Sequence, residues 1–332
     1  MFRFLIKIIL LAVLVAAFAF FANAQIGPSQ NSTFIELRQN FDGPQKDFPG
    51  PNESYAARLL SAAFDPRSAN ITWFFNGKEV LKGAGANAYN FNTSGLGSTI
   101  NLRVTALAGA ISYEASRTLT VNDVDLLWRA ETSIPRWYKG KALASPGSTV
   151  IITAFPDVAS GGRKLSASNL IYRWSLDGED QPDASGLNRK SIILRASSEV
   201  NLPQQITLKV SNADQTVGAQ KTTEMALTSP EIVFYEEHAL EGPVGNLALE
   251  RIDMSPGEEK EFRSSPYFFS QGETLTREWR VDREKTEKGG PEELLRLKVV
   301  PEASGFITVE NIIQNLKSVF QQARATLIIN VR

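Results

Sequence analysis

The chain contains no cysteine and only one histidine, His238. The missing cysteines exclude disulfides, a thiol nucleophile and a zinc site built from cysteine and histidine. Any metal site would therefore need oxygen ligands. A serine–histidine–aspartate triad would depend on His238, and the sequence has no Gly-x-Ser-x-Gly elbow to supply its nucleophile. These absences predict a protein that is not an enzyme and has no cofactor.

An excess of charge of either sign is also missing. The chain has 35 Lys and Arg against 36 Asp and Glu, a net charge of −1, and no block of basic residues. Nucleic-acid binding needs a basic face, so the sequence predicts no nucleic-acid partner. The chain has 332 residues, of which 42% are hydrophobic, which is enough to bury a core in each of two or three domains.

The N-terminus has the pattern of an export signal. Arg3 and Lys7 precede an apolar run at residues 8–21, and Ala22-Asn23-Ala24 supplies the small residues of a cleavage site. The run is shorter than the roughly 20 residues of a membrane-spanning helix. This predicts a cleaved signal peptide over residues 1–24 and a location outside the cytoplasm, either extracellular, on the cell surface or in the periplasm. The alternative is an uncleaved anchor that tethers the chain to the membrane.

A strand that carries a tryptophan and runs into a tight turn occurs three times. The three stretches are residues 71–78, 172–179 and 277–284, and their tryptophans are Trp73, Trp174 and Trp279. Each lies downstream of a Pro-Gly turn, and the tryptophans are 174 − 73 = 101 and 279 − 174 = 105 residues apart. This spacing equals one small all-β domain. Recurrence at a fixed place favours core packing of the three tryptophans over ligand stacking.

The repeat predicts three domains in tandem. Their bounds are residues 25–122, 123–228 and 229–332, with hinges at residues 122–125 and 229–230. Because these hinges are too short for the domains to tumble freely, we expect neighbouring domains to be in contact. Residues 55–64 are rich in Ala and Leu and would be helical by propensity, but their place in the repeat favours a strand. Residues 307–322 are expected to contain a helical turn, because Ile312, Leu316 and Phe320 are spaced by four.

The tryptophan strands resemble those of immunoglobulin-like sandwiches, and more closely their PKD-like and bacterial surface variants. The matching turns are Asn76-Gly77 and Asp177-Gly178, whereas the third repeat has Asp282-Arg283 without the glycine. The resemblance implies an all-β chain of three tandem immunoglobulin-like (PKD-like) β-sandwich domains after the signal peptide. Since no inter-sheet disulfide is available, each tryptophan is expected to pack on apolar neighbours.

Longer stretches in the second and third domains resemble uncharacterised exported multidomain proteins of small-genome candidate-phyla bacteria. They are residues 127–132, 135–143, 229–238 and 266–270. This resemblance implies a surface or envelope protein to which no activity is assigned.

Two groups of aromatic residues are candidate partner contacts, because aromatic side chains are enriched in binding interfaces. They are Trp137 and Tyr138 in one group, and Tyr267, Phe268 and Phe269 in the other. The same residues also suit packing between neighbouring domains, which we favour.

Two groups of ionisable residues allow a functional interpretation. His238 lies beside Glu236 and Glu237, a pattern that suits a general base but also an exposed polar surface. Asp123 and Asp125, in the first hinge, would bind calcium if further oxygen ligands such as that of Asp214 came close, and are otherwise part of a solvated turn.

The sequence therefore predicts a non-enzymatic exported protein of the cell surface or envelope. Its domains would act as spacer and binding modules in adhesion or surface assembly, with an unidentified protein or glycan partner. It would meet the membrane only through an uncleaved N-terminal segment. One alternative is a set of accessory domains in an envelope glycan-processing system, which predicts a cleft holding paired carboxylates about 5 to 10 Å apart. The other is a membrane-tethered scaffold.

Overall fold

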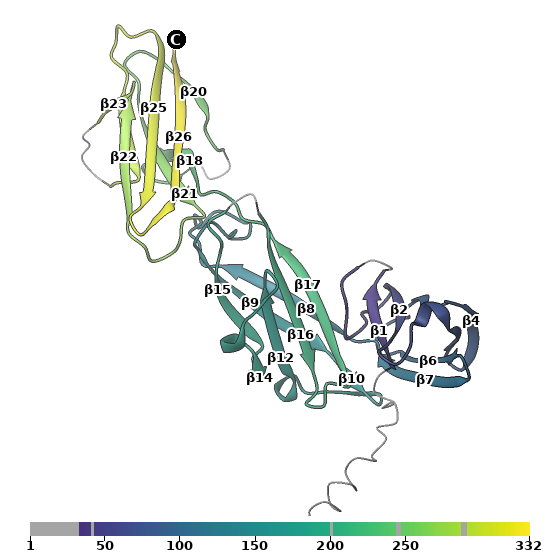
Figure 1. Ribbon diagram of the computed structural model, residues 1–332. Coiled ribbons are helices and arrows are strands. Elements are labelled where there is room, and N and C mark those ends of the chain that lie inside the picture. The colour runs from purple at the N-terminus through teal and green to yellow at the C-terminus, as the bar shows by residue number, and fades with distance from the viewer. Residues whose placement is uncertain (1–32, 41–42, 200–201, 244–246, 287–290) are drawn as a thin grey trace, which may run out of the picture. The chain divides into compact units, whose positions relative to one another are not determined.

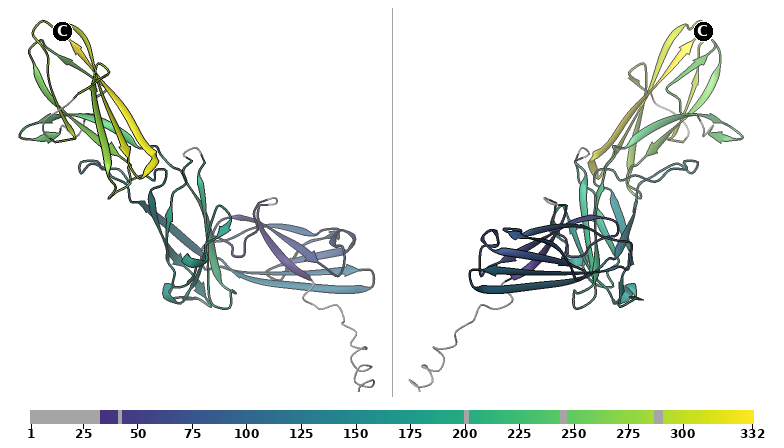
Figure 2. Two further views of the ribbon diagram at one scale, coloured as in Figure 1. Left: turned by 60° about the vertical axis from the view of Figure 1, so that its left-hand side comes forward. Right: turned by 90° about the vertical axis from the view of Figure 1, so that its right-hand side faces the viewer.

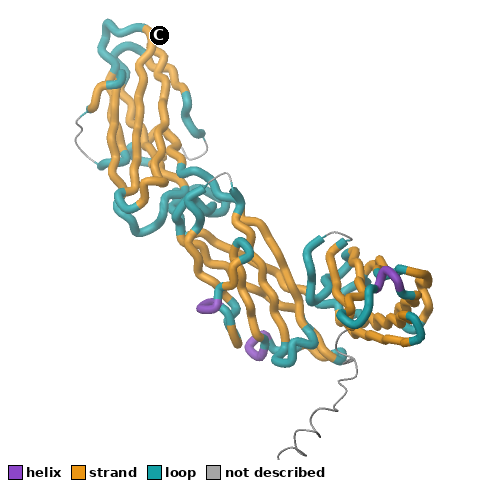
Figure 3. The backbone as a smooth tube through the Cα atoms, in the orientation of Figure 1, coloured by secondary structure: helices purple, strands orange, loops and turns teal. Residues whose placement is uncertain are grey.

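The computed structural model describes residues 33–40, 43–199, 202–243, 247–286 and 291–332 (Figure 1). The predicted signal peptide lies outside the described residues. The chain divides into two compact units, Met1–Val121 and Asn122–Arg332. The described residues form strands and loops with three short 3-10 helices and no α-helix (Figure 3). These short helices are η2 (Pro66–Ser68), η3 (Ala167–Asn169) and η4 (Pro182–Ala184).

The first unit is a sandwich of two antiparallel sheets. One sheet has the order β1-β2-β5, with β1 (Thr33–Gln39), β2 (Ser54–Ser61) and β5 (Ala88–Asn92). The other has the order β4-β3-β6-β7, with β3 (Asn70–Phe75), β4 (Lys78–Ala84), β6 (Thr99–Ala108) and β7 (Ile111–Thr120). Alternating buried and exposed residues along β6 place one face of this sheet in the core. Residues 55–64, helical by propensity, lie largely in β2, as their place in the repeat predicts.

The second unit begins with a sandwich of the same strand order. Its first sheet is β15-β9-β8, with β8 (Asp123–Ala130), β9 (Thr149–Asp157) and β15 (Ser191–Arg195). Its second sheet is β13-β12-β16-β17, with β12 (Ile171–Leu176), β13 (Glu179–Asp180), β16 (Gln204–Ser211) and β17 (Gly218–Met225). Three small strands lie outside this order, namely β10 (Ala159–Ser160), β11 (Arg163–Lys164) and β14 (Gly186–Leu187).

A further sandwich completes the second unit. One sheet is β19-β18-β21-β24, with β18 (Glu231–His238), β19 (Gly242–Pro243), β21 (Glu259–Tyr267) and β24 (Leu294–Lys298). The other is β20-β26-β25-β22-β23, with β20 (Arg251–Met254), β22 (Leu275–Val281), β23 (Glu284–Lys285), β25 (Gly305–Asn315) and β26 (Ser318–Val331). Strand β20 pairs in parallel with β26.

The three sandwiches divide their main strands in the same way. The count leaves out the additional strands β10, β11, β14, β19 and β20. Of the seven strands that remain in each sandwich, the first, second and fifth form one sheet, and the third, fourth, sixth and seventh form the other. This division of strands between two packed sheets is immunoglobulin-like. The chain is therefore all-β and consists of tandem immunoglobulin-like sandwiches.

The repeated tryptophans occupy equivalent places in the three cores. Trp73, Trp174 and Trp279 are 0, 1 and 2% exposed. Each indole N–H donates to a backbone carbonyl 13 or 15 residues further along the chain, at 2.8 to 3.0 Å; these carbonyls belong to Ala86, Arg189 and Glu292. Each ring thus buries a large apolar surface while its polar atom is satisfied.

The turn after each tryptophan strand is also repeated. Its two central residues have positive φ in all three cases: Asn76 (50°) and Gly77 (82°), Asp177 (51°) and Gly178 (84°), and Asp282 (47°) and Arg283 (73°). Two consecutive left-handed residues are typical of a type I′ hairpin turn. The first residue of each turn also accepts a backbone N–H through its side-chain oxygen at 2.8 Å, from Asn101, Gln205 and Thr308. The third turn therefore forms without the glycine that the other two have.

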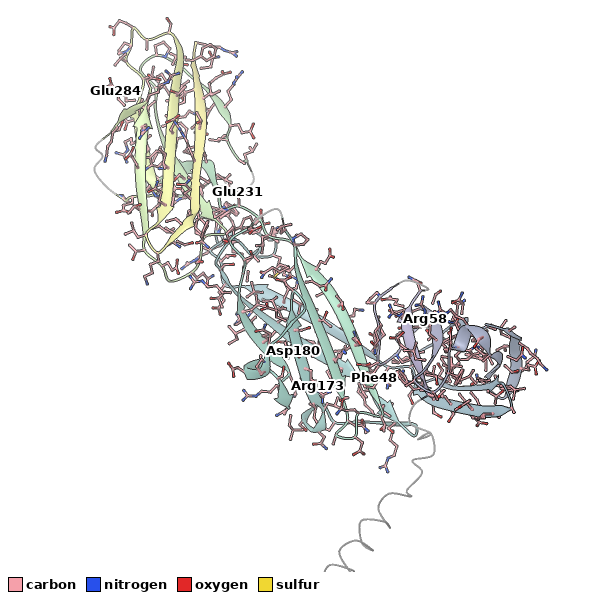
Figure 4. All side chains as sticks on the ribbon, viewed as in Figure 1. Phe48, Arg58, Arg173, Asp180, Glu231 and Glu284 are labelled. Carbon is pink, nitrogen blue, oxygen red and sulfur yellow. The ribbon has the colours of Figure 1, made fainter. Side chains whose placement is uncertain are left out.

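Arg283→Gly is expected to raise the free energy of unfolding of the second unit by about 0.5–1 kcal/mol. A left-handed conformation costs a non-glycine residue about 1–2 kcal/mol, and the greater freedom of glycine in the unfolded chain offsets part of the gain. Urea unfolding measures the change. The control is Glu284→Gly at the next residue, which lies in β23 and is labelled in Figure 4, and which should be destabilising. A loss of stability in Arg283→Gly would contradict the prediction.

Two local predictions were wrong. The expected helical turn within residues 307–322 is instead the hairpin of β25 and β26, in which Val309, Asn311 and Ile313 are buried in alternation. Burial along β25 alternates with the two-residue period of a strand, and the four-residue spacing of Ile312, Leu316 and Phe320 does not produce a helix. The expected hinge at residues 122–125 is mostly strand, because β8 begins at Asp123 and buries Val124 completely.

Candidate functional site

The second unit contains a junction at which its two sandwiches meet. The connection between β8 and β9, residues 131–148, lies against the segment that follows β21. Thr132 and Ser270 form an antiparallel bridge. Three backbone hydrogen bonds extend it: the N–H groups of Ser133, Phe268 and Gln271 donate to the carbonyls of Phe269, Ser133 and Glu131 at 2.7, 2.7 and 3.0 Å. The two sandwiches therefore share a short β-ladder in addition to side-chain contacts.

Aromatic rings pack on one side of this ladder. Trp137 meets Tyr235 edge-on with ring centroids 5.5 Å apart, and Tyr138 meets Tyr267 edge-on at 5.2 Å. The hydroxyls of Tyr235 and Tyr267 are hydrogen-bonded at 2.6 Å. The aromatic cluster consists of Ile134, Trp137, Tyr138, Leu143, Val233, Tyr235, Tyr267 and Phe268. Edge-to-face rings are a favourable arrangement that adds to the burial of their area.

The candidate partner contacts lie at or next to this junction. Tyr267, Phe268 and Phe269 are 5, 5 and 0% exposed. Phe269 packs on Ile232 and Ile313 inside the third sandwich. A partner cannot reach rings that are this deeply buried, so their geometry supports the alternative of packing between neighbouring domains. Trp137 and Tyr138 are half-buried in the same cluster.

The backbone at Phe268 is unusual. Its φ of 63° is left-handed, which is rare for an aromatic residue. Such a conformation costs of order 1–3 kcal/mol and persists only where the surrounding structure imposes it. Here its N–H donates to Ser133 at 2.7 Å and its ring is buried in the cluster. Phe268 therefore holds its strained backbone within the ladder that joins the two sandwiches.

A glutamine completes the junction on the β26 side. Gln321 is fully buried, and its Oε1 accepts from the N–H of Ser270 at 3.0 Å and from Asn315 Nδ2 at 2.8 Å. Its Nε2 donates to Pro146 O at 2.8 Å, Ser270 Oγ at 2.8 Å and Ser145 Oγ at 3.1 Å. Pro146 and Ser145 belong to the second sandwich. One buried amide therefore joins the two sandwiches with all of its polar atoms paired.

Sequence reasoning missed Gln321, although a signal was present. Gln321 shares the inward parity of Leu327, Ile329 and Val331 on β26. A polar residue at an inward position of a strand indicates a buried hydrogen bond. Its partners Ser145 and Pro146 belong to the second of the three Pro-Gly turns, which gives this turn a role beyond the repeat.

Alkaline pH is expected to weaken the second unit through Tyr267. Burial, with the hydrogen bond to Tyr235, raises the pKa of the Tyr267 phenol far above its usual value of 10.0. The folded state then holds the proton more tightly than the unfolded state, so the contribution to stability is complete below pH 10 and is lost as pH rises above it. Thermal unfolding between pH 8 and 11 measures this loss. Tyr267→Phe should show a shallower decline, and equal slopes in the two proteins would count against the prediction.

The ionisable candidates are not assembled into a catalytic group. The side chain of His238 is half-exposed, with Nε2 4.0 Å from a Glu236 oxygen that also binds Lys260 at 2.8 Å. Asp123 accepts from the N–H of Val124 and lies 4.0 Å from the Lys221 ammonium. Within the described part of the chain, no three His, Asp or Glu residues are grouped so as to hold a metal ion.

The described surface also has shallow hollows. Four of them have volumes between about 230 and 460 Å³. Their described lining residues include at most one carboxylate each, Asp65 in one hollow and Asp180 in another. These four hollows therefore lack the paired acids that a glycan-processing site requires.

The comparisons with known proteins find only distant likenesses to solved structures. No family model and no curated protein matches the chain. A structure of three N-terminal domains of the highly immunogenic outer capsid protein of bacteriophage RB49 is 13% identical, over 91% of this chain and 98% of that one, with a TM-score of 0.25. A structure of three titin immunoglobulin domains is 12% identical over 85% and 93%, with a TM-score of 0.22. Fibronectin(III)-like modules of Clostridium thermocellum CbhA are 14% identical over 59% and 94%, with a TM-score of 0.25. The assignment of the fold here rests on the strand order of the sandwiches themselves.

Among the described residues, no helix has the length and apolar character needed to span a membrane.

Proposed function

We propose that the chain is a non-enzymatic exported protein of the cell surface or envelope whose immunoglobulin-like domains serve as spacer and binding modules. This role suits adhesion or surface assembly. The surface or envelope setting is also what the sequence resemblance to exported multidomain proteins of candidate-phyla bacteria implies, and no activity is assigned to those proteins. The N-terminal sequence pattern supports export. The partner would be a protein or glycan met outside the cytoplasm.

The junction in the second unit is the observation that carries the spacer role. A spacer has to keep its domains in a fixed arrangement, which requires an interface that resists bending. Gln321, the ladder through Thr132 and Ser270, and the aromatic cluster supply buried contacts across the junction. Glu231 marks the end of the third sandwich at which β18 begins (Figure 4), and the closed end of the β25–β26 hairpin lies at this junction in both views of Figure 2.

A spin-label distance tests the spacer role. Since the chain has no cysteine, Asp183→Cys and Glu302→Cys introduce two unique labelling sites at exposed positions of the second and third sandwiches. Double electron–electron resonance spectroscopy should give one narrow distribution of the distance between the two spin labels. A broad distribution would show two freely jointed sandwiches and contradict the spacer role.

Export is tested separately in cells that make the protein. A membrane-impermeant amine reagent should label the chain on intact cells, and mass spectrometry should find a mature N-terminus at Gln25. A retained N-terminal segment in the membrane fraction would instead favour the tethered scaffold. A chain protected from the reagent until the cells are lysed would contradict surface exposure.

A further inference from the structure

The outer face of the β15-β9-β8 sheet, in the second sandwich, carries large apolar residues (Figure 1). Inward and outward residues alternate along each strand, and Val124, Ile152 and Leu194 point into the core. The large apolar residues of the opposite parity, here called the apolar patch, are Leu127, Ile151, Phe155 and Ile193. Of these, Leu127, Phe155 and Ile193 are 62, 53 and 69% exposed. The patch is therefore open to a partner.

The four residues of the apolar patch are neighbours. The strand register places Ile151 opposite Ile193, and Thr153 opposite Leu127. Ile151 and Phe155 lie two residues to either side of Thr153 on β9, so each is at a diagonal position from Leu127, within reach of a large side chain. One of the four hollows, with a volume of about 230 Å³, lies between β8 and β9 on this patch. The patch thus crosses all three strands without interruption.

The fold does not require an apolar surface at this place. The equivalent sheet of the third sandwich, β19-β18-β21-β24, carries ion pairs on its outer face. Arg263 pairs with Glu237 at 2.7 Å, and Arg296 pairs with Glu261 at 3.4 Å. Contiguous exposed apolar residues on a soluble protein mark a site of interaction. The apolar patch therefore indicates an interface that is specific to the second sandwich.

Two residues of opposite charge flank the apolar patch along β8. Asp125 lies two residues before Leu127 and Arg129 two residues after it, so all three side chains share one face. Asp125 and Arg129 are separated by about 13 Å, at about 3.3 Å per residue of strand, which is too far for them to pair with each other. The face thus has a negative group on one side of Leu127 and a positive group on the other. Such a pattern is complementary to itself when it is inverted.

We propose that this face binds the same face of a second copy of the chain, in a dimer with two-fold symmetry. A two-fold interface brings identical surfaces together and makes each contact between different residues twice. An axis that crosses the strands above Leu127 places the two copies of Leu127 against each other. The same axis places Phe155 of one copy against Ile151 of the other. It also places Asp125 of one copy against Arg129 of the other, which gives two ion pairs at the edge of an apolar contact.

The charges select this axis over the one that runs along β9. That second axis would lay Arg129 of one copy on Ile193 of the other, and Leu127 on Ser191, as the strand register shows. A guanidinium group would then be buried on an apolar side chain without a carboxylate, which is costly. The axis across the strands also keeps the strand directions of the two sheets aligned, as in natural sheet packing.

The ends of β8 are compatible with this arrangement. Asp123 and Glu131 of different copies approach each other there, but each already has a cation on its own copy. The Lys221 ammonium lies 4.0 Å from Asp123, and the Arg129 guanidinium lies 3.6 Å from Glu131. The face is only three strands wide, which is typical of the small interfaces of transient complexes. We therefore expect a dissociation constant between about 1 μM and 1 mM.

The dimer gives the proposed binding role a partner, and it rests on that role only for its place in surface assembly. Its test is made on the purified full chain and is independent of export and of the junction. Failure of one proposal therefore leaves the other standing.

Sedimentation equilibrium of the full chain, over the concentration range of the expected dissociation constant, measures dimer formation. Leu127→Lys places a charge at the centre of the face in both copies and should weaken the dimer at least about tenfold. The matched control is Leu187→Lys, since Leu187 is 64% exposed in the same sandwich but belongs to β14, which pairs with β12 in the other sheet. This control should dimerise like the wild type. Thermal unfolding verifies that each variant is folded.

Charge reversal tests the arrangement of the two copies. Asp125→Arg and Arg129→Asp, made singly, each place like charges opposite one another and should weaken the dimer. The double variant exchanges the two charges and should recover the wild-type affinity to within about threefold. Since the two residues are too far apart to pair within one copy, recovery reports a contact between copies.

Three results would overturn the proposal. They are a chain that stays monomeric over the whole concentration range, equal affinities of Leu127→Lys and Leu187→Lys, and a double variant that binds no better than the single variants. A monomeric chain that instead forms a complex with a different surface protein through Leu127 would also overturn it, because the face would then serve another partner.

Discussion

Gln321→Leu is expected to uncouple the two sandwiches of the second unit and to lower its free energy of unfolding by about 3 kcal/mol or more. Leucine fills a similar volume but leaves the N–H of Ser270 and the carbonyl of Pro146 buried without the amide that now pairs them. Each buried polar group left unpaired costs about 1–3 kcal/mol. The substitution weakens the junction in particular, because the Pro146 carbonyl belongs to the second sandwich and the Ser270 N–H to the third.

Gln322→Leu is the matched control, since Gln322 is the next residue of β26 and is exposed. It should change stability by less than about 0.5 kcal/mol. In the Gln321→Leu protein, the urea unfolding of the second unit should separate into one transition for each of its two sandwiches. The distribution of spin-label distances should broaden. If Gln321→Leu and Gln322→Leu proved equally stable, the buried amide would not hold the junction.

A double-mutant cycle locates the effect further. Ser145→Ala removes an acceptor of Gln321 Nε2 from the second sandwich while leaving the third intact. Residues in one hydrogen-bond network typically show a coupling energy of 0.5–3 kcal/mol. Additive effects of Ser145→Ala and Gln321→Leu would mean that this hydrogen bond contributes nothing across the junction.

The fold class was predictable because its signals are local and repeated. A strand with alternating burial needs only its own residues to reveal its period, as in β6. The Asn76-Gly77 and Asp177-Gly178 turns indicate hairpins on the same local basis. The third turn shows the limit of this rule, because Asp282 and Arg283 adopt the same conformation with no glycine to announce it.

The errors arose where tertiary structure decides. The spacing of Ile312, Leu316 and Phe320 suits a helix turn, but pairing of β25 with β26 and β22 places the segment in a sheet. The hinge at Asp123 was assigned from polar residues, and β8 pairs with β9 from that residue onward. Polar composition marks a linker only when no neighbouring strand satisfies its backbone.

The residue types of the candidate site were predictable, and packing between neighbouring domains was the favoured role, but the contacts that form the site were not predictable. Aromatic side chains near loops suit a partner and a neighbouring domain equally well. The choice between them depends on contacts between segments far apart in sequence, such as the bond from Ser133 to Phe269, which are 136 residues apart. No local pattern encodes that distance. Gln321 was missed for another reason, since its inward parity on β26 is a local signal but residues 307–322 were expected to contain a helical turn.

Trp174→Ala is expected to lower the free energy of unfolding of the second sandwich by about 3–5 kcal/mol, the typical cost of removing a buried tryptophan. The ring lies opposite Leu208 in the β12–β16 register, inside the core of that sandwich. Its loss leaves a large cavity and removes the indole hydrogen bond to the carbonyl of Arg189. Since a domain is stable by only about 5–15 kcal/mol, this change removes a large share of the total.

Trp128→Ala is the control within the same sandwich, because Trp128 is half-buried and has the Lys141 ammonium over its ring. It should cost clearly less than Trp174→Ala. Trp73→Ala is the control in the first unit and should leave the unfolding of the second unit unchanged. Circular dichroism during thermal and urea unfolding, with each unit's transition followed separately, measures all three. If Trp174→Ala cost no more than Trp128→Ala, the repeated tryptophan would not hold the core, and its recurrence would need another explanation, such as ligand stacking.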